Sequence, residues 1–349
     1  MVIARIDPGR DPRWQRFVET RPDAGIFHTS AWLEALRRTY GYEPVVYAAI
    51  DSGKGLVNAV PFCLIRSRLT GRRLVSLPFS DHCQPLASTE ELHVLLAAAK
   101  EDAQRHNCKY VETRPLTPYE QDVTTAAELT NSYDAVIHRL DLRRSRDEVF
   151  RGFHKDCTQR KISRSEREQL RYEEGRSEEL LQKFYHLLLL TRRRHQLPPQ
   201  PFFWFRNLIA CLGEKLKIRV ASSKDGIPVA SIITLSFKDV VTYKYGCSDS
   251  RFNALGGMVF LIWRTVQEAL NNGAAELDLG RSDHDTPGLI AFKDHWGAVR
   301  YRLTYYTYPA RAVATEKGRL LKAAGKRLVA AIPDPLFTTL GGLLYRHVG

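Results

Sequence analysis

The sequence has no cysteine pair of the CxxC type, no run of about 20 apolar residues, and no apolar core near its first residue. The six cysteines are scattered, so they indicate neither a disulfide framework nor a zinc module. The opening segment Met1–Arg10 contains Asp7 and Pro8 where a signal peptide would be apolar. These absences predict a cytoplasmic protein that binds no metal.

Basic residues are abundant. Lys and Arg number 52 against 39 Asp and Glu, which gives a formal net charge of +13. Such a surface attracts anions, including coenzyme A phosphates, tRNA, anionic lipid headgroups and phosphate-bearing glycan precursors, and the charge does not choose among them. The chain of 349 residues exceeds the size at which one hydrophobic core usually stops growing, so two domains are expected.

Strand and helix patterns alternate in both halves, which predicts mixed α/β domains at 1–141 and 142–308. In the first half, Ser30 is expected as the N-cap of a helix that ends near Gly41. The other elements expected there are strands over 44–50, 56–66, 73–77 and 110–114 and a helix over 89–106. The second half is expected to hold a hairpin over 228–237 and 240–246, a helix over 258–272 closed by Gly273, and strands over 274–279 and 299–308.

The tail, 309–349, combines apolar residues at helical spacing with basic residues around them. The apolar positions are Leu320, Leu321, Ala324, Leu328, Val329 and Ile332, and the basic ones are Arg311, Lys317, Arg319, Lys322, Lys326 and Arg327. A basic amphipathic helix of this kind can lie on an anionic membrane, and it can equally dock on its own domain or on a partner. Peripheral contact with the inner face of a membrane is therefore one of the expectations left open.

Residues 142–171 are dense in basic side chains interrupted by acids. Interleaved charges on a helix are typical of a solvated face with local ion pairs, and phosphate binding is the alternative.

Several motifs occur in the order found in one family. They are Tyr245–Asp249, the helix with Trp263, Asp278–Ser282, Phe292-Lys293 and Trp296-Gly297. Together they resemble the FemAB and BioF2-like acyltransferases. The segment Thr191–His195, followed by Pro198–Pro201, is similar to a signature of members associated with bacterial exopolysaccharide or cell-envelope synthesis. The resemblance implies tandem GNAT-like domains, with the active site on the second domain or in a cleft between the two.

The stretch Arg251–Gly257 lies between an expected strand and an expected helix, where backbone N–H groups and the helix dipole favour an anion. It approximates the pyrophosphate loop of GNAT enzymes, with Ala254 in place of the first glycine, and the bland alternative is an ordinary turn. The residues expected to bind the acyl donor are Arg251, Asn253, Gly256, Gly257 and Tyr245.

The resemblance places Lys293 at the active site, where an ammonium can neutralise a phosphate or stabilise an oxyanion. Asp278 and His284 are the candidate proton acceptors, although Asp278 could cap the following loop and His284 could be an incidental loop residue. The expected substrate-binding residues are Arg281, Ser282, Phe292 and Trp296. Direct transfer needs no covalent intermediate, so Cys83 is expected to be a core thiol.

The leading hypothesis is an N-acyltransferase that moves an acyl group from acyl-CoA to an amine of an amino sugar or of an envelope or exopolysaccharide precursor, which could be lipid-linked. An aminoacyl-tRNA donor is the alternative within the same family, and nucleic acid is a partner only in that case. A basic nucleic-acid-binding protein and a catalytically silent scaffold are the competing hypotheses of other classes.

Overall fold

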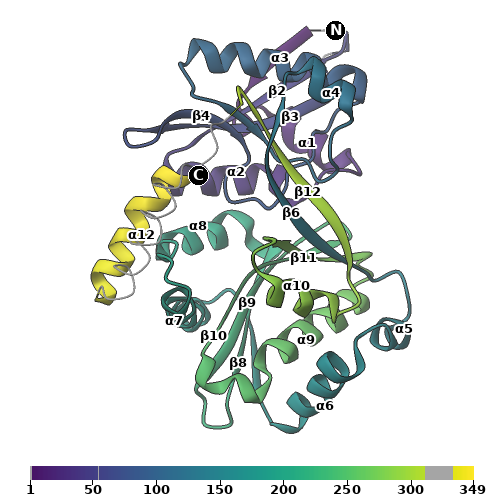
Figure 1. Cartoon of the computed structure of the whole chain (residues 1–349), viewed down its shortest axis with the longest axis vertical. Helices are drawn as coiled ribbons and strands as arrows, with labels where there is room; N and C mark the ends of the chain where they lie inside the picture. The colour runs from purple at the N-terminus through teal and green to yellow at the C-terminus, as the bar shows by residue number, and fades with distance from the viewer. Residues whose placement is uncertain (1, 54, 311–332) are drawn as a thin grey trace. The chain divides into compact units, whose positions relative to one another are not determined.

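The computed structural model describes residues 2–53, 55–310 and 333–349 (Figure 1). The predicted basic helix, which depends on residues 311–332, lies outside the described residues. No helix in the described part of the chain is long and apolar enough to cross a membrane.

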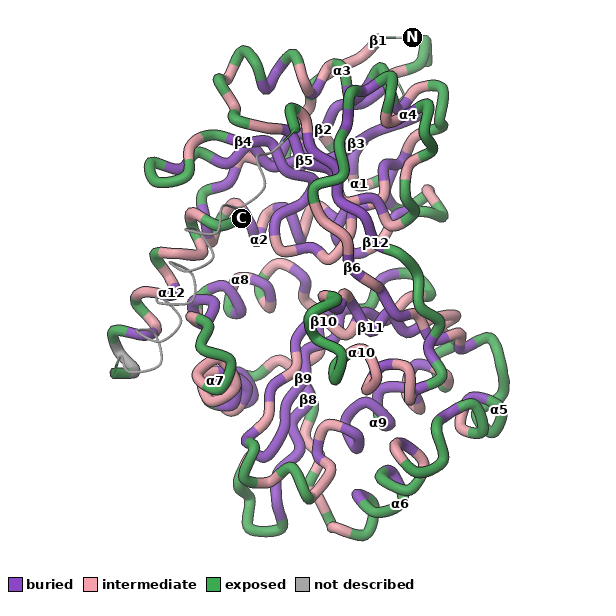
Figure 2. The backbone as a smooth tube through the Cα atoms, viewed as in Figure 1, coloured by how far each residue is buried: buried purple, intermediate pink, exposed green. Residues whose placement is uncertain are grey.

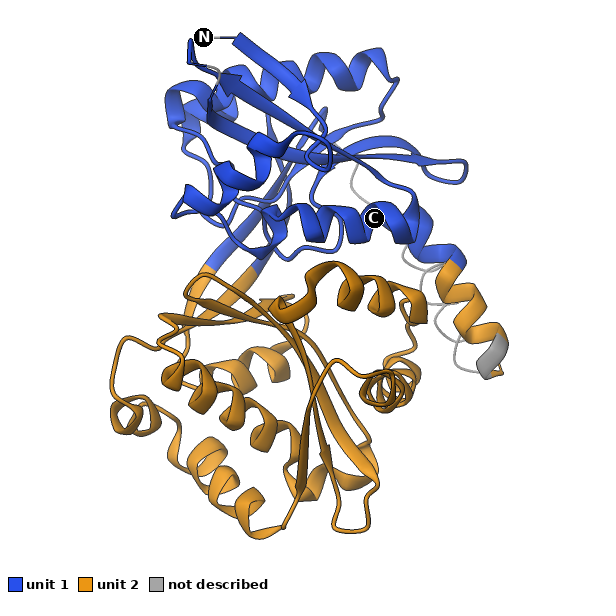
Figure 3. Cartoon of the chain, turned by 180° about the vertical axis from the view of Figure 1, so that it is seen from behind, with its two compact units in different colours: residues 1–135, 302–314, 343–349 blue, residues 136–301, 315–342 orange. Residues whose placement is uncertain are grey.

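The described residues form two compact units (Figure 3). Unit 1 holds residues up to 135 with 302–310 and 343–349, and unit 2 holds 136–301 and 333–342. Three elements contribute residues to both units: β6 (Thr130–Asp141), β12 (Val299–Tyr308) and α12 (Asp334–Val348). The domain limits at 141 and 308 remain a prediction.

Unit 1 is a twisted sheet with helices. Its strand order is β1-β2-β3-β4-β5-β12, in which β4 and β5 are parallel and the other neighbouring pairs are antiparallel. The first five strands are β1 (Val2–Ile6), β2 (Glu43–Ile50), β3 (Leu56–Ser67), β4 (Gly71–Ser76) and β5 (Val111–Thr113). The helices are α1 (Pro12–Thr20), α2 (Ser30–Tyr40), α3 (Thr89–Arg105) and α4 (Gln121–Ala126), with a short 3₁₀ turn, η1 (Ile26–His28).

The ends of α2 show how local sequence sets the helix boundaries. Thr29, and not Ser30, is the N-cap: the Thr29 hydroxyl accepts a hydrogen bond from Trp32 N at 3.3 Å. Gly41 ends the helix with φ +69°, as the sequence predicted. The predicted N-cap was wrong by one residue because Thr29 and Ser30 are adjacent and each carries a hydroxyl that can cap a helix.

Unit 2 has the strand order β6-β11-β10-β9-β8-β7. Strands β7 to β10 form an antiparallel meander, β10 and β11 are parallel, and β11 and β6 are antiparallel. The strands not yet given are β7 (Arg171–Gly175), β8 (Leu216–Ser222), β9 (Pro228–Phe237), β10 (Val240–Ser248) and β11 (Glu276–Ser282). The mixed α/β fold class is therefore confirmed.

The helices of unit 2 cover both faces of this sheet. They are α5 (Arg146–Arg151), the π-turn η2 (Lys155–Gln159), α6 (Arg160–Arg167), α7 (Glu178–Arg194), α8 (Phe202–Leu212), α9 (Gly257–Asn271) and α10 (Pro287–Asp294), with 3₁₀ turns η3 (Gly213–Lys215) and η4 (Ser250–Leu255). Figure 1 shows α7 and α9 on opposite faces of β8–β10. Figure 2 shows that these strands and the inner sides of both helices are buried. The N-terminal end of α9 lies next to α6, where Gly256 approaches Ser165.

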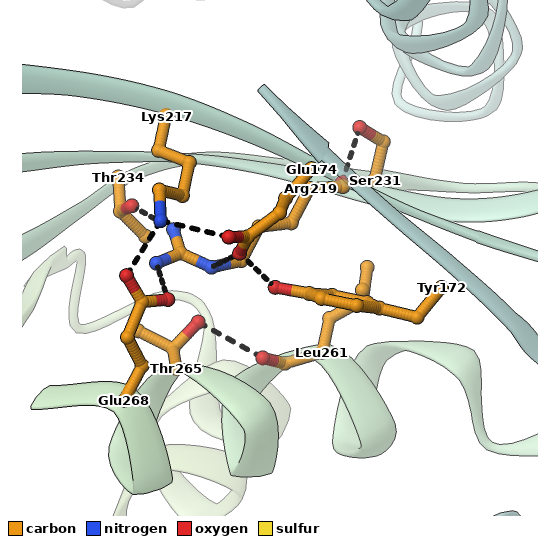
Figure 4. A network of polar contacts seen from close by, with 9 residues as sticks. All are labelled: Tyr172, Glu174, Lys217, Arg219, Ser231, Thr234, Leu261, Thr265 and Glu268. Atoms are coloured by element: carbon orange, nitrogen blue, oxygen red, sulfur yellow. Dashed lines mark hydrogen bonds and ion pairs between the residues drawn. The ribbon is translucent and has the colours of Figure 1, made fainter. Parts of the chain in front are cut away.

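A polar network fastens α9 to the sheet (Figure 4). Arg219 on β8 is 3% exposed, and its Nη2 atom lies 2.6 Å from Glu268 Oε2 on α9. Lys217 Nζ lies 2.6 Å from the other carboxylate oxygen of Glu268 and 2.9 Å from Glu174 Oε1 on β7. Arg219 also donates to the Thr234 hydroxyl on β9. A guanidinium keeps its charge when buried, so these partners are needed to offset the cost of removing Arg219 from water.

Candidate functional site

A cavity of about 260 Å³ opens at the N-terminal end of α9. Its lining comes from η4 and α9, from β9 and β10, and from α6. The lining residues are Lys161, Arg164, Val229, Ala230, Ser248, Phe252, Asn253, Ala254, Gly256, Gly257, Met258 and Val259. All of them belong to unit 2, so one unit forms this cavity.

Two glycines shape the wall of the cavity. Gly256 has φ +72°, a conformation that only glycine adopts without strain, and a Cβ there would lie 3.3 Å from Ser165 Cβ on α6. A Cβ on Gly257 would lie 3.0 Å from side-chain atoms of both Ala230 and Val229 on β9. The start of α9 therefore approaches α6 and β9 more closely than a residue with a side chain would allow.

The cavity is lined by main-chain N–H groups and by two cationic side chains. The first N–H groups of an α-helix have no partner within the helix, and in the described part of the chain no side chain caps α9. The first main-chain bond of the helix runs from Phe260 N to Gly256 O, which leaves the N–H groups of Gly257, Met258 and Val259 at the cavity wall. Lys161 and Arg164 add two exposed cationic side chains one turn apart on α6, and Arg164 also forms an ion pair with Glu168 at 3.3 Å. This arrangement is suited to an anion such as phosphate.

The structure separates the residues expected to bind the donor. Asn253, Gly256 and Gly257 line the cavity. The guanidinium of Arg251 instead forms an ion pair with Asp249, at 2.6 Å, with its own side chain 74% exposed. Tyr245 is buried elsewhere in unit 2, where its hydroxyl accepts a hydrogen bond from Trp204 Nε1 at 2.9 Å.

A second feature is the separation of β10 from β11. Among the described residues these strands pair only over Val240–Thr242 and Glu276–Asp278, although β10 continues to Ser248 and β11 to Ser282. The register of β11 against β6 also shifts between Asp278 and Arg281. Beyond Thr242, main-chain N–H groups on that edge of β10 are consequently no longer used by β11.

Asp278 and Lys293 both contact Gly280, which lies in the irregular part of β11 between Asp278 and Arg281 (the β11 bulge). Asp278 is 3% exposed, and its Oδ1 atom accepts a hydrogen bond from Gly280 N at 2.7 Å. Lys293, on α10, is equally buried, and its Nζ atom donates to Gly280 O at 2.8 Å and to Arg281 O at 2.9 Å. Two residues that the sequence predicted for the active site thus contact the same glycine from different elements.

Three of the predicted substrate-binding residues are near this point. Ser282, the last residue of β11, is 2% exposed, and its hydroxyl has no hydrogen-bond partner among the described residues. Arg281 lies 3.4 Å from Asp283 in an ion pair. Phe292 is half-buried on α10. A buried hydroxyl without a partner costs free energy unless a ligand or water satisfies it.

His284 and Trp296 lie in different surroundings. His284 is exposed in the loop before α10. Trp296 is fully buried and packs edge-on against Phe153, with ring centroids 5.1 Å apart, in the hydrophobic core under α9. Trp296 is therefore a core residue, which is the commoner role of a tryptophan beside a glycine turn.

Lys161, Arg164 and His138 were missed as individual site residues. The basic run 142–171 contained the signal for the first two, but which of its charges face α9 depends on how α6 packs. His138 Nε2 lies 3.2 Å from Oδ1 of Asp294, the residue that follows Lys293 in the chain. Burial and the charge of Lys293 lower the pKa of His138, which the hydrogen bond to Asp294 opposes only in part.

Cys83 is not an activated nucleophile. Its Sγ atom lies 3.5 Å from His28 Nε2 within unit 1. Burial raises the pKa of Cys83 to about 12 and lowers the pKa of His28 to about 4. Both groups are therefore neutral near pH 7, and a thiolate–imidazolium pair does not form.

Comparison with known proteins agrees with this geometry. Residues 151–294 match a family model described as "Acetyltransferase (GNAT) domain". The structure of FemX is similar, with a TM-score of 0.71 and 14% identity over 93% of this chain and 100% of that one. No curated protein sequence matches the chain.

Two further solved structures share the fold at the same 14% identity. One is a tandem GNAT protein from the clavulanic acid biosynthesis pathway, with a TM-score of 0.57 over 89% of this chain and 99% of that one. The other is the C-terminal domain of a putative lysylphosphatidylglycerol synthetase from Agrobacterium fabrum, with a TM-score of 0.56 over 85% and 91%. The chain therefore shares its fold with FemX and with the tandem GNAT protein, and residues 151–294, which carry the α9 cavity, match the model of a GNAT acetyltransferase domain.

Proposed function

We propose that the protein is an N-acyltransferase that uses acyl-CoA as its donor and binds the donor's phosphates in the α9 cavity. The observation that carries this proposal is the convergence of uncapped N–H groups of α9 with Lys161 and Arg164 on one cavity. Asn253, Gly256 and Gly257 form the loop side of the site. Arg251 and Tyr245 act indirectly, by holding the turn and the underlying core.

The acyl group would then lie where β10 and β11 separate. A neutral amine attacks the thioester carbonyl, the C–N bond forms, and the C–S bond breaks as the intermediate collapses to an amide and the thiolate of coenzyme A. Main-chain N–H groups of β10 beyond Thr242 stabilise the oxyanion. The amine loses one proton and the thiolate takes one, so no covalent enzyme intermediate or metal is needed.

Lys293 and Asp278 have complementary roles in this proposal. The Lys293 ammonium is held beside the bulge by two carbonyl groups, where it supplies positive charge to the acceptor or to the oxyanion. Asp278 orients Gly280 and is the candidate to receive the amine proton, with the exposed His284 as the alternative. Arg281, Ser282 and Phe292 would contact the acceptor.

For the acceptor we propose an amino sugar or a related amine of an envelope or exopolysaccharide precursor, acted on in the cytoplasm or at the inner face of the membrane. Support comes from the motif Thr191–His195 with Pro198–Pro201. Its two parts contact each other, since Arg192 donates to Gln200 Oε1 at 3.0 Å.

The test is equilibrium binding of acetyl-CoA and longer acyl-CoAs to the purified full chain. Lys161→Ala and Arg164→Ala should each weaken binding about 5- to 30-fold, because each removes one charged contact to phosphate. Arg167→Ala is the matched control: it changes an exposed arginine on the same helix that does not line the cavity. Equal losses in all three variants, or no binding at any chain length, would reject the proposed donor site.

An aminoacyl-tRNA donor is the second candidate, favoured by the similarity to FemX over the full length of that chain. Charged tRNA should compete with acyl-CoA if both use the α9 cavity. Saturable binding of charged tRNA without any acyl-CoA binding would establish this candidate in place of the first. Binding of random RNA that is unaffected by Lys161→Ala and Arg164→Ala would instead indicate general nucleic-acid binding.

A further inference from the structure

His154, Cys157 and His295 form a cluster on the surface of unit 2. One potential ligand atom from each residue lies within 4.8 Å of the other two. His154 precedes η2, Cys157 lies within it, and His295 is the C-cap of α10. His154 is exposed and the other two residues are half-buried, so solvent reaches the cluster.

Main-chain hydrogen bonds fix the two segments that carry the cluster. His154 N and the Thr158 hydroxyl both donate to the carbonyl oxygen of His295, at 2.9 Å and 2.8 Å. The imidazole rings of His154 and His295 lie with their centroids 4.7 Å apart. The fold therefore brings the three side chains together.

The His154 ring already presents a lone pair to the η2 turn. Its Nδ1 atom accepts a hydrogen bond from Cys157 N at 3.2 Å, so the neutral ring carries its proton on Nε2. A cation at Nδ1 would replace that N–H partner. The neighbouring thiol would lose its proton on coordination, as a cysteine ligand must.

The donor set selects a class of metal. Two imidazole nitrogens and one thiolate are typical ligands of Zn²⁺, whereas Mg²⁺ and Ca²⁺ prefer oxygen. Zn–N and Zn–S bonds of about 2.0–2.3 Å require donor atoms about 3.3–3.7 Å apart in a tetrahedron, which is within reach of the observed spacing. Three protein ligands leave the fourth position for water.

We propose that His154, Cys157 and His295 bind one Zn²⁺ ion that clamps the C-terminal end of α10 to the η2 turn. This site is separate from the proposed donor cavity, none of whose lining residues belongs to it. Its consequence is to hold α10, and with it Lys293, against β11. The proposal does not depend on the identity of the acyl donor.

The experiment is titration of the untagged, metal-free full chain with Co²⁺, which reports a thiolate ligand by a charge-transfer band and tetrahedral geometry by its visible spectrum. We expect one equivalent to bind with the charge-transfer band, and Zn²⁺ to remove the band by displacement. Cys157→Ser should abolish the band. His154→Asn, which keeps an oxygen that can cap η2, and His295→Ala should each weaken binding by at least about tenfold.

Two control variants separate a built site from adventitious binding. Cys108→Ser changes another half-buried thiol, and His93→Ala changes an exposed histidine on α3 of unit 1. Both should bind Co²⁺ as the wild type does, and circular dichroism should confirm that every variant is folded. A band that survives Cys157→Ser, or a wild-type chain that binds no stoichiometric Co²⁺, would overturn the proposal.

Discussion

Replacing Glu268 with glutamine removes a negative charge that two basic side chains share. Arg219 Nη2 and Lys217 Nζ each lie 2.6 Å from one oxygen of the Glu268 carboxylate (Figure 4). In the Glu268→Gln variant, Arg219 stays charged and buried, with Glu174 at 3.8 Å as its remaining acidic neighbour. The variant is therefore expected to lose stability while keeping the volume of the side chain.

The magnitude follows from the burial of the two partners. Removing one member of a fully buried pair costs about 3–5 kcal/mol. The Arg219 side chain is 4% exposed but that of Glu268 is 30% exposed, and Glu174 remains. We therefore expect the free energy of unfolding to fall by about 2–3 kcal/mol, which urea titration at neutral pH measures directly.

The pH dependence of this difference has a defined sign. Burial by itself would raise the pKa of Glu268, but hydrogen bonding to Lys217 and the charge of Arg219 outweigh it, so the pKa lies below its ordinary value. The contribution is present above the pKa of glutamate in the unfolded chain and is lost as pH falls through the lower pKa of the folded state. Wild type and Glu268→Gln should therefore converge in stability at acidic pH.

Two comparisons make the reasoning refutable. The exposed pair of Glu178 with Arg206, on α7 and α8, provides the control Glu178→Gln, which should leave the free energy of unfolding almost unchanged. The double variant Arg219→Met with Glu268→Leu should be less destabilised than Glu268→Gln alone, because no buried guanidinium is left without its partner. If Glu268→Gln behaves like the exposed control, the network does not hold α9 in the way we infer.

Two further predictions concern other buried groups. Burial lowers the pKa of His28 to about 4, so its contribution to stability is present above about pH 6.5 and should be lost, by up to about 3 kcal/mol, as pH falls toward 4. His28→Gln should lack this part of the pH dependence in urea titrations, and an unchanged profile would contradict the assignment. Lys293→Met should lower turnover, followed as thiol release from acyl-CoA with a panel of amino sugars, by about 100-fold or more while leaving acyl-CoA binding intact. Turnover close to the wild-type value in a folded Lys293→Met protein would exclude a role for this ammonium in the reaction.

Patterns of hydrophobic residues predicted many elements in the second half of the chain well. The hairpin over 228–237 and 240–246 corresponds to β9 and β10, and the strand over 299–308 corresponds to β12. The helix over 258–272 is α9, displaced by one residue, with Gly273 after it at φ +71°. These elements have a buried face with regular spacing and clear turn residues, so local sequence is enough to define them.

The segment 142–171 shows where local patterns were insufficient. It contains α5, η2 and α6. Within α6, only Ile162 and Ser165 are buried. A segment so rich in charge is typical of a solvated face, so its sequence does not indicate which residues pack against α9. Its position against α9 is set by contacts such as the close approach of Gly256 to Ser165, which no pattern within the segment reveals.

The sequence by itself determined the mixed α/β class, the resemblance to acyltransferases, and the segments containing Asn253, Gly256, Asp278 and Lys293. Only the tertiary structure decided which of these residues meet. Helix packing brought Lys161 and Arg164 to the start of α9 and enclosed Trp296 in the core. The physical reason is that composition and periodicity are local properties, whereas a binding site depends on side chains that are distant in the chain and become neighbours only when the helices pack on the sheet.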